Sequence, residues 1–212
     1  MFPNNLSNQI KSKDRVRDVA EVFTAKIQVN DMLDLVRDYS ENIEGTFLEP
    51  ACGNGNFLVI ILERKLQRVL ELSKNPRHKS QASIEFMLIK TVSSIYGVDI
   101  MPDNIIEAHE RLKGTLKNFF YENYNTRRVN DGFWKVVDWV LYQNIVVGNT
   151  LEAPAKIIFL DYGTPKKLYF KIKEFYLQKP HQDLFNETIE LSKYPLTHYL
   201  DLSDLKITKN AY

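Results

Sequence analysis

A glycine-containing turn between two apolar segments, residues 47–57, constrains the fold of this chain more than any other feature. The apolar run Phe47–Leu48 ends at Glu49, the chain turns through Gly53 and Gly55, and an apolar, helix-forming run begins at Phe57. Glycines let backbone N–H groups approach a ligand, and the helix that follows adds the positive end of its dipole. The segment therefore predicts a strand, a cofactor-binding turn and a helix; the alternative is a purely structural turn.

The glycine spacing argues against a dinucleotide as the ligand. The dinucleotide fingerprint Gly-x-Gly-x-x-Gly would place a third glycine at position 58, which is leucine here. The segment Glu-Pro-Ala-Cys-Gly-Asn-Gly-Asn-Phe instead resembles the cofactor loop of the DNA adenine-N6 methyltransferases of restriction-modification systems. The resemblance implies that S-adenosylmethionine is the cofactor. It implies the following contacts: Glu49 and the backbone of Ala51, Cys52, Gly53 and Gly55 around the cofactor, and Phe57 packed beside it.

Two further segments resemble the same family upstream and downstream of this loop. Phe23 and Thr24 resemble its opening motif, in which the threonine binds the methionine end of the cofactor, although Ala25 stands where proline is usual. Downstream, an apolar run ends at Asp99 and Ile100. A carboxylate at the tip of a parallel strand can accept from both ribose hydroxyls, so we expect Asp99 to hold the ribose. The alternative is that Asp99 caps the helix that follows.

A third segment, the β-branched run 144–147, leads through a glycine into Asn149. The resemblance places Asn149 where the family often carries an aspartate that accepts from the adenine amino group. An asparagine oxygen can do the same. The alternative is that Asn149 forms a turn after the glycine, which is a frequent role of this residue.

The catalytic motif of the family is absent from this sequence. Adenine-N6 methyltransferases carry Asn, Asp or Ser followed by two prolines and an aromatic residue, but no two of the eight prolines here are adjacent. That motif accepts the protons of the adenine amino group and stacks on the flipped base, which makes the nitrogen nucleophilic. The resemblance therefore predicts a cofactor lobe in which no residue can be assigned as the catalyst.

Several functions remain open on this basis. The chain can belong to an enzyme that methylates adenine in DNA once a partner subunit or a further C-terminal domain supplies the catalytic loop and target recognition. It can equally be a truncated or catalytically inactive relative that acts as a regulatory or partner-binding subunit. A scaffold without cofactor, and methylation of RNA, protein or a small molecule, are further alternatives, because fold does not imply function.

Composition narrows the class of protein further. The chain has 212 residues, of which 44% are hydrophobic and 26% charged, and its formal net charge of +1 gives no global basic footprint for nucleic acid. Its single cysteine, Cys52, cannot form an internal disulfide, and no apolar run has membrane-spanning length. We therefore expect a cytoplasmic protein without membrane contact. The four histidines show no metal-ligand spacing, so no metal is expected.

The resemblance implies an α/β, Rossmann-like fold of the class I S-adenosylmethionine-dependent methyltransferases, preceded by an N-terminal helical segment. Patterning gives four or five strands, fewer than the seven usual in the family, so an incomplete sheet is expected. Residues 1–160 are expected to form the cofactor-binding domain, with 1–12 loose, and residues 161–212 a divergent extension. Helices are expected over 14–38 with a break near 23–24, 57–72, 82–93, 103–120, 133–142 and 183–191. Strands are expected over 45–49, 94–100, 144–147 and 156–160, with partly alternating character over 168–177.

Two sets of apolar side chains at helical spacing are expected to face the core. The set in the N-terminal helix is Val29, Met32, Leu33 and Val36. The set in the 103–120 helix is Ile106, Leu112, Leu116 and Phe119 or Phe120. The two tryptophans, Trp134 and Trp139, are expected to pack in the core and not to form a platform for stacked bases.

Overall fold

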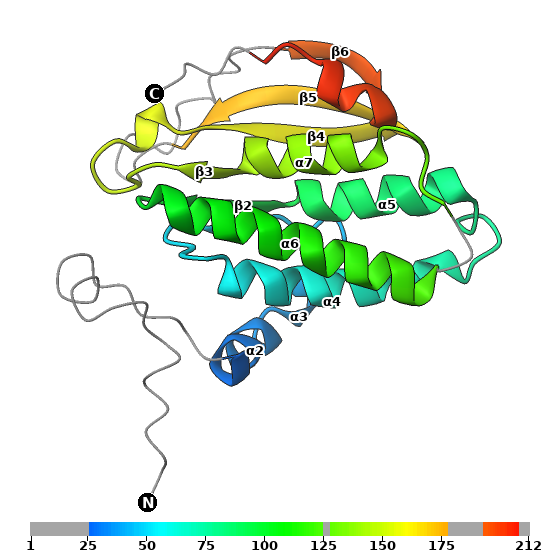
Figure 1. Ribbon diagram of the computed structural model, residues 1–212, viewed down its shortest axis with the longest axis horizontal. Helices are drawn as coiled ribbons and strands as arrows, with labels where there is room; N and C mark the ends of the chain where they lie inside the picture. The colour runs from blue at the N-terminus through cyan, green and yellow to red at the C-terminus, as the bar shows by residue number, and fades with distance from the viewer. Residues whose placement is uncertain (1–25, 125–127, 178–192, 208–212) are drawn as a thin grey trace, which may run out of the picture.

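Two separate three-stranded sheets organise the chain (Figure 1). The structure, a computed structural model, describes residues 26–124, 128–177 and 193–207. Sheet A is parallel and has the strand order β1 (Phe47–Glu49), β2 (Ile95–Asp99), β3 (Ile145–Val147). Sheet B is antiparallel and has the order β4 (Ile158–Lys166), β5 (Tyr169–Tyr176), β6 (Lys193–His198). The fold is therefore mixed α/β.

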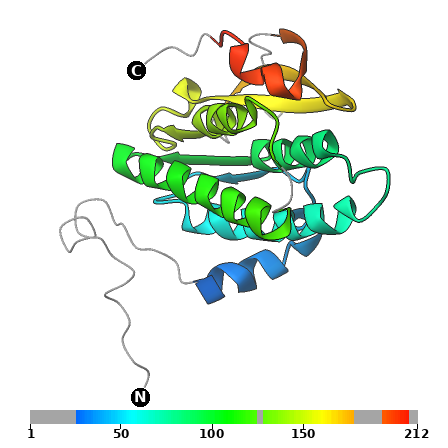
Figure 2. The ribbon, with the colours of Figure 1, turned by 45° about the vertical axis from the view of Figure 1, so that its right-hand side comes forward.

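The helices arrange these sheets in layers (Figures 1 and 2). Helices α4 and α6 lie on one side of sheet A, sheet B lies on the other, and α5 and α7 run directly into β2 and β3. The bounds of the helices are α2 (Lys26–Asp34), α3 (Arg37–Ser40), α4 (Asn56–Ser73), α5 (Gln81–Ser93), α6 (Pro102–Asn123), α7 (Phe133–Asn144), η2 (Pro154–Lys156) and η3 (Tyr199–Asp204). Among the described residues, no helix is both long and apolar enough to cross a bilayer.

Alternate residues of β2 face the two layers beside it, as the period of a strand requires. Ile95 belongs to the main core, to which α4, α5, α6 and α7 contribute. Tyr96 and Val98 form a second core cluster with Ile157 and Phe159, at and just before the start of β4. The rings of Tyr96 and Phe159 lie 5.2 Å apart. Strand β2 therefore contributes to both clusters, and sheet B also reaches the main core through Leu160, Tyr162, Phe170 and Ile172.

The helices form where apolar residues recur at helical spacing and where the ends are capped. In α4, Leu58, Ile61, Leu62 and Leu66 are all buried, a pattern of i, i+3, i+4 and i+8. Each such side chain contributes about 1.5–3 kcal/mol when fully buried. Helix α5 begins after Ser80, whose side chain accepts a hydrogen bond from the Ser83 N–H at 3.3 Å.

The structure confirms the elements that the sequence predicts through β3. The helices expected over 57–72, 82–93, 103–120 and 133–142 are α4, α5, α6 and α7, and the first three strands are β1, β2 and β3. The part of the 14–38 helix that is described appears as α2 and α3, with a break between them. Trp134 and Trp139 are partly buried against the main core, as expected.

Three residues predicted for the core are exposed instead. Met32 and Ile106 are 55% and 61% exposed, because Val29 with Leu33, and Ile105 with Ala108 and Leu112, occupy the buried faces of their helices. Successive residues of a helix turn by about 100°, which places Met32 and Ile106 outside these buried faces. Val36 is 43% exposed because α2 ends at Asp34 and Val36 precedes α3 with non-helical dihedral angles.

Sheet B was only partly expected. The strand predicted over 156–160 is longer, the 168–177 segment is β5, and β6 had no counterpart in the prediction. Burial alternates along β5, with Phe170, Ile172 and Glu174 buried. Residue 160, the expected end of the cofactor domain, lies inside β4. The expected helix over 183–191 and the expected loose residues 1–12 lie outside the described part of the chain.

A lysine is buried where sheet A begins. Lys65 of α4 has no exposed surface, and its Nζ donates to the Gly45 carbonyl and to Ser94 Oγ, the latter at 2.6 Å. Its Nζ also lies 5.5 Å from the centre of the Phe47 ring. Burial lowers the pKa of Lys65 from 10.5 to about 7, because an ammonium loses its hydration there. The side chain thus connects the chain just before β1 to the residue just before β2.

Stability should increase with pH because of this lysine. Between pH 7 and about 10.5 the unfolded chain binds a proton that folded Lys65 does not, so the free energy of unfolding rises by up to about 1.4 kcal/mol per pH unit. Below pH 7 both states bind the proton and this slope disappears. Lys65→Met should remove this contribution, so that its stability increases less with pH than that of the unmodified chain in urea unfolding at pH 7, 8 and 9. Leu66→Met, a buried neighbour without an ionisable group, should retain it; equal slopes for Lys65→Met and the unmodified chain would contradict the assignment.

Candidate functional site

The carboxyl ends of the strands of sheet A meet at one edge, and Asp99 is the centre of the contacts there. Its Oδ2 accepts from the Gly53 N–H at 2.9 Å. Its Oδ1 accepts from the Met101 N–H at 2.9 Å and from Asn104 Nδ2 at 3.1 Å. Asp99 therefore holds the glycine loop and also orders the start of α6, and its expected contact with the ribose stays a prediction.

The glycine loop needs its glycines for two separate reasons. Gly53 and Gly55 have φ of 52° and 78°, in the region that residues with a side chain rarely adopt. A Cβ on Gly55 would lie 2.9 Å from the Ala108 Cβ of α6. Because Gly55 is the N-cap of α4 and has no side chain, no cap from this position covers the first N–H groups of the helix. The loop thus places α6 close to a helix N-terminus that is suited to an anion.

Residues of α6 that the sequence analysis did not single out hold the far side of the loop. Asn54 Nδ2 donates to Glu107 Oε1 at 2.6 Å. Arg111 donates to the Asn54 carbonyl at 2.9 Å and to Asn56 Oδ1 at 3.1 Å. The residues Asn104, Glu107 and Arg111 recur at i, i+3 and i+7, which places them on one face of the helix. That spacing was visible in the sequence and could have identified them.

Glu49 and Cys52 occupy the end of β1 and the start of the loop. The half-buried Glu49 has its Oε1 3.4 Å from the Ala51 N–H, and burial raises the pKa of its carboxyl. Burial, followed by the charges of Asp99 and Glu49, raises the pKa of the Cys52 thiol. Cys52 is 6% exposed, so it is a neutral packing residue and not a nucleophile. Within the described ranges, no group of three or more His, Cys, Asp or Glu side chains comes together as a metal site.

The loop after β3 crosses the end of β2. Gly148 N–H donates to the Asp99 carbonyl at 2.9 Å, and Thr150 Oγ1 donates to the Pro50 carbonyl at 3.2 Å, on the far side of β2. Asn149 Oδ1 accepts from the N–H groups of Leu151 and Glu152, both at 3.0 Å. Both lone pairs of this oxygen are therefore used within the turn. The geometry agrees with the turn-forming interpretation of Asn149.

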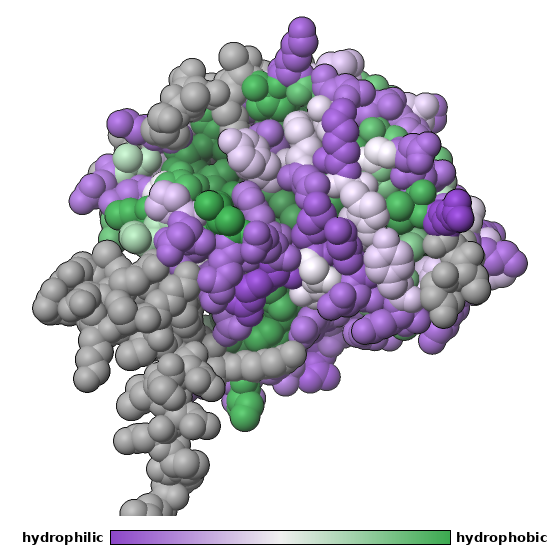
Figure 3. Space-filling model, in the orientation of Figure 1, coloured by the Kyte–Doolittle hydropathy of each residue, from purple (hydrophilic) through white to green (hydrophobic). Residues whose placement is uncertain are grey.

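Apolar side chains are exposed around this edge. Ile100, Val147 and Leu151 are 54%, 44% and 85% exposed. Figure 3 shows hydrophobic surface gathered on the side of the molecule where β2 and β3 end. Phe57, in the first turn of α4, is half-buried against the main core. Phe23 and Thr24 lie outside the described residues.

The edge thus combines three kinds of group. Asp99 and Glu49 supply carboxylate acceptors, the start of α4 supplies N–H donors, and the exposed side chains supply an apolar surface. The chain was compared with models of protein families, with curated proteins and with solved structures, and none of these comparisons finds a match. Chemically, the edge suits a ligand that carries hydroxyl groups, an anionic group and a flat apolar ring.

The close contact between Gly55 and α6 can be tested by adding a single methyl group. Gly55→Ala should lower the free energy of unfolding by about 2–4 kcal/mol, because a side chain is strained at positive φ and would overlap Ala108. The matched control is Gly114→Ala in the middle of α6, where a Cβ meets nothing within 4 Å. It should stabilise the protein by about 0.5–1 kcal/mol. Urea unfolding of both variants measures the difference, and a neutral Gly55→Ala would refute the geometry.

Proposed function

We propose that this chain binds S-adenosylmethionine at the carboxyl edge of sheet A and is a cofactor lobe of the DNA adenine-N6 methyltransferase type. The observation that carries the proposal is the hydrogen bond between Asp99 and the glycine loop. It joins the two segments that the resemblance assigns to the ribose and to the cofactor loop, 46 residues apart in the chain. Their strands are adjacent and parallel, with Glu49 opposite Gly97.

Each part of the cofactor has a candidate partner at this edge. Asp99 Oδ2 carries one hydrogen bond from Gly53, which leaves acceptor capacity for a ribose hydroxyl. The N–H groups at the start of α4 suit the carboxylate of the methionine moiety. Ile100 and Leu151 offer apolar contacts for the adenine ring. Asn149 orders the loop instead of accepting from the adenine. The roles expected for Phe23 and Thr24 at the methionine end stay predictions.

The arrangement of sheet A favours a Rossmann-like fold and also indicates which strands would be needed to complete the sheet. In doubly wound sheets the ligand lies where the strand order reverses, beside the first strand. Among the described residues, β1 pairs only with β2, so the strands that would continue the sheet past β1 are not supplied by this part of the chain. A partner subunit or a further domain that adds them would also be the source of the catalytic loop and of DNA recognition.

A catalytically inactive, regulatory or partner-binding relative is the second candidate. The sequence has no Asn, Asp or Ser followed by two prolines and an aromatic residue, and the oxygen of Asn149 is occupied within its own turn. Both facts are consistent with a domain that binds the cofactor but does not transfer its methyl group. The two candidates share cofactor binding and differ in methyl transfer.

Cofactor binding is tested by calorimetric titration of the purified chain with S-adenosylmethionine. Ile100→Asp should weaken binding by at least about tenfold, because a charge placed against an apolar ring must be desolvated. It leaves the loop contacts of Asp99 in place. The control is Leu196→Asp on β6, which changes a comparably exposed apolar residue of sheet B and should bind as the unmodified chain does. Absence of binding by folded protein, or equal binding by Ile100→Asp, would reject the site.

Methyl transfer is tested separately. The purified chain alone should transfer little or no labelled methyl from S-adenosylmethionine to adenine in DNA, because the sequence lacks the motif that activates the amino nitrogen in the family it resembles. Incorporation of label into adenine would overturn this expectation. Binding in calorimetry without methyl transfer would support a cofactor-binding lobe that requires a partner subunit or domain for catalysis.

A further inference from the structure

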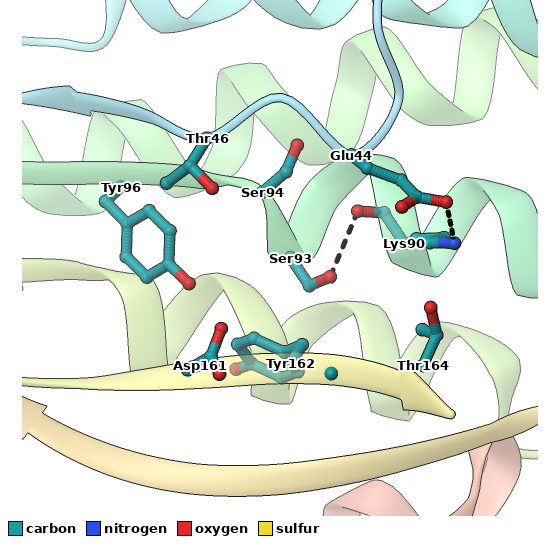
Figure 4. A pocket seen from close by; sticks show the side chains of 10 residues that line it. Glu44, Thr46, Lys90, Ser93, Ser94, Tyr96, Asp161, Tyr162 and Thr164 are labelled. Carbon is teal, nitrogen blue, oxygen red and sulfur yellow. Dashed lines mark hydrogen bonds and ion pairs between the residues drawn. The ribbon is translucent and has the colours of Figure 1, made fainter. Parts of the chain in front are cut away.

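A second site lies at the opposite end of sheet A from the glycine loop. A cavity of about 150 Å³ opens between the residues that precede β1 and β2 and the middle of β4 (Figure 4). Its walls include Thr46, Ser93, Ser94 and Tyr96 on the sheet A side and Asp161 on the sheet B side. At about 30 Å³ for each water molecule, the space holds about five. It is therefore large enough for a small organic molecule.

Six side chains that line this cavity carry hydroxyl groups, of which Thr46 and Thr164 are the less buried. The other four, Ser93, Ser94, Tyr96 and Tyr162, are at least nine-tenths buried. Each of the four donates its proton to a protein oxygen. The two serines donate to backbone carbonyls of α5, Ser93 to Lys90 at 3.0 Å and Ser94 to Thr91 at 2.8 Å. The two tyrosines donate to the Leu160 carbonyl (Tyr96, 2.7 Å) and to Asn144 Oδ1 (Tyr162, 3.2 Å). A hydroxyl whose proton is committed can only accept from a ligand. These walls therefore offer hydrogen-bond acceptors, of which Ser94 Oγ already accepts one bond from Lys65 Nζ.

The charged groups of the lining also favour a ligand that donates hydrogen bonds. Lys90 forms an ion pair with Glu44, so the cation of the lining already has its carboxylate. Asp161 projects from β4 toward Tyr96 (Figure 4), and within the described residues its carboxylate makes no hydrogen bond or ion pair. Lys173 is its cross-strand neighbour on β5 and does not line the cavity. The lining thus has one carboxylate, Asp161, that pairs with no other lining residue, beside several oriented acceptors.

We propose that this cavity binds a small organic cation with N–H donors, of the alkylammonium or guanidinium class. Such a cation would donate to the hydroxyl oxygens and form a charge-assisted hydrogen bond with Asp161. A cation of the same charge without N–H groups leaves these oriented acceptors without a donor. The site is separate from the carboxyl edge of sheet A, so it does not depend on whether S-adenosylmethionine binds there.

The test titrates isotope-labelled full-length chain with propylammonium, methylguanidinium or tetramethylammonium, and follows the backbone amide resonances by NMR. Saturable shifts should appear at Thr46, Ser93 and Thr164 with propylammonium or methylguanidinium, and the identity of the cation that gives them decides which of the two classes is bound. Tetramethylammonium, which has no N–H donor, should bind at least about tenfold more weakly. Binding of tetramethylammonium with equal affinity, or shifts spread over the surface with all three cations, would overturn the proposal.

A pair of variants tests the carboxylate. Asp161→Asn should weaken binding of the cation by about tenfold, as expected for the loss of a charge-assisted hydrogen bond. Asp131→Asn removes the same charge from an exposed residue in the connection before α7 and should leave the affinity unchanged. Both substitutions are at exposed positions, so the fold should tolerate them. Unchanged affinity in Asp161→Asn would exclude the site.

Discussion

The carboxylate of Asp99 is the contact on which the carboxyl end of sheet A depends. The strands of this sheet have only three to five residues, so their own ladders provide few hydrogen bonds. Asp99 adds bonds to the glycine loop and to the start of α6, while its carbonyl accepts from Gly148 after β3. One residue at the end of the middle strand therefore joins the segments that follow all three strands. A ligand at this edge would meet a loop that is already ordered, which lowers the entropic cost of binding.

The two ends of sheet A differ in chemistry because different layers meet there. At the carboxyl end, the start of α4 and the turns after β2 and β3 bring together N–H donors, carboxylates and exposed apolar side chains. At the amino end, α5 enters β2 opposite β4, and the hydroxyl groups of Ser93, Ser94 and Tyr96 are oriented by backbone carbonyls. Tyr96 connects β2 to sheet B, since its ring packs on Phe159 and its hydroxyl donates to the Leu160 carbonyl.

Much of sheet A and its helices could be predicted from the sequence, because there local pattern and tertiary packing agree. The glycine loop was identified from its turn pattern, and Asp99 from an apolar run that ends in a carboxylate together with the family resemblance; Asp99 lies beside the loop. Exposure of Met32 and Ile106 could not be deduced, because an apolar residue next to a buried one fits the same pattern. Sheet B was missed in part because its strands depend on partners far apart in the chain: β6 pairs with β5 across residues 178–192. The second bond of Asn149 likewise depends on the turn conformation and not on composition.

The buried position of Lys65 has a consequence for chemical labelling. An amine with a pKa of about 7 is a much better nucleophile toward acylating reagents at neutral pH than an ordinary lysine, but reagents in solution cannot reach a side chain with no exposed surface. Acylation of Lys65 then requires the segments that begin at Gly45 and Ser94 to separate, since its Nζ is bonded to both. Its labelling rate, compared with that of surface lysines, would report how often the amino end of the parallel sheet opens while the rest of the molecule stays folded.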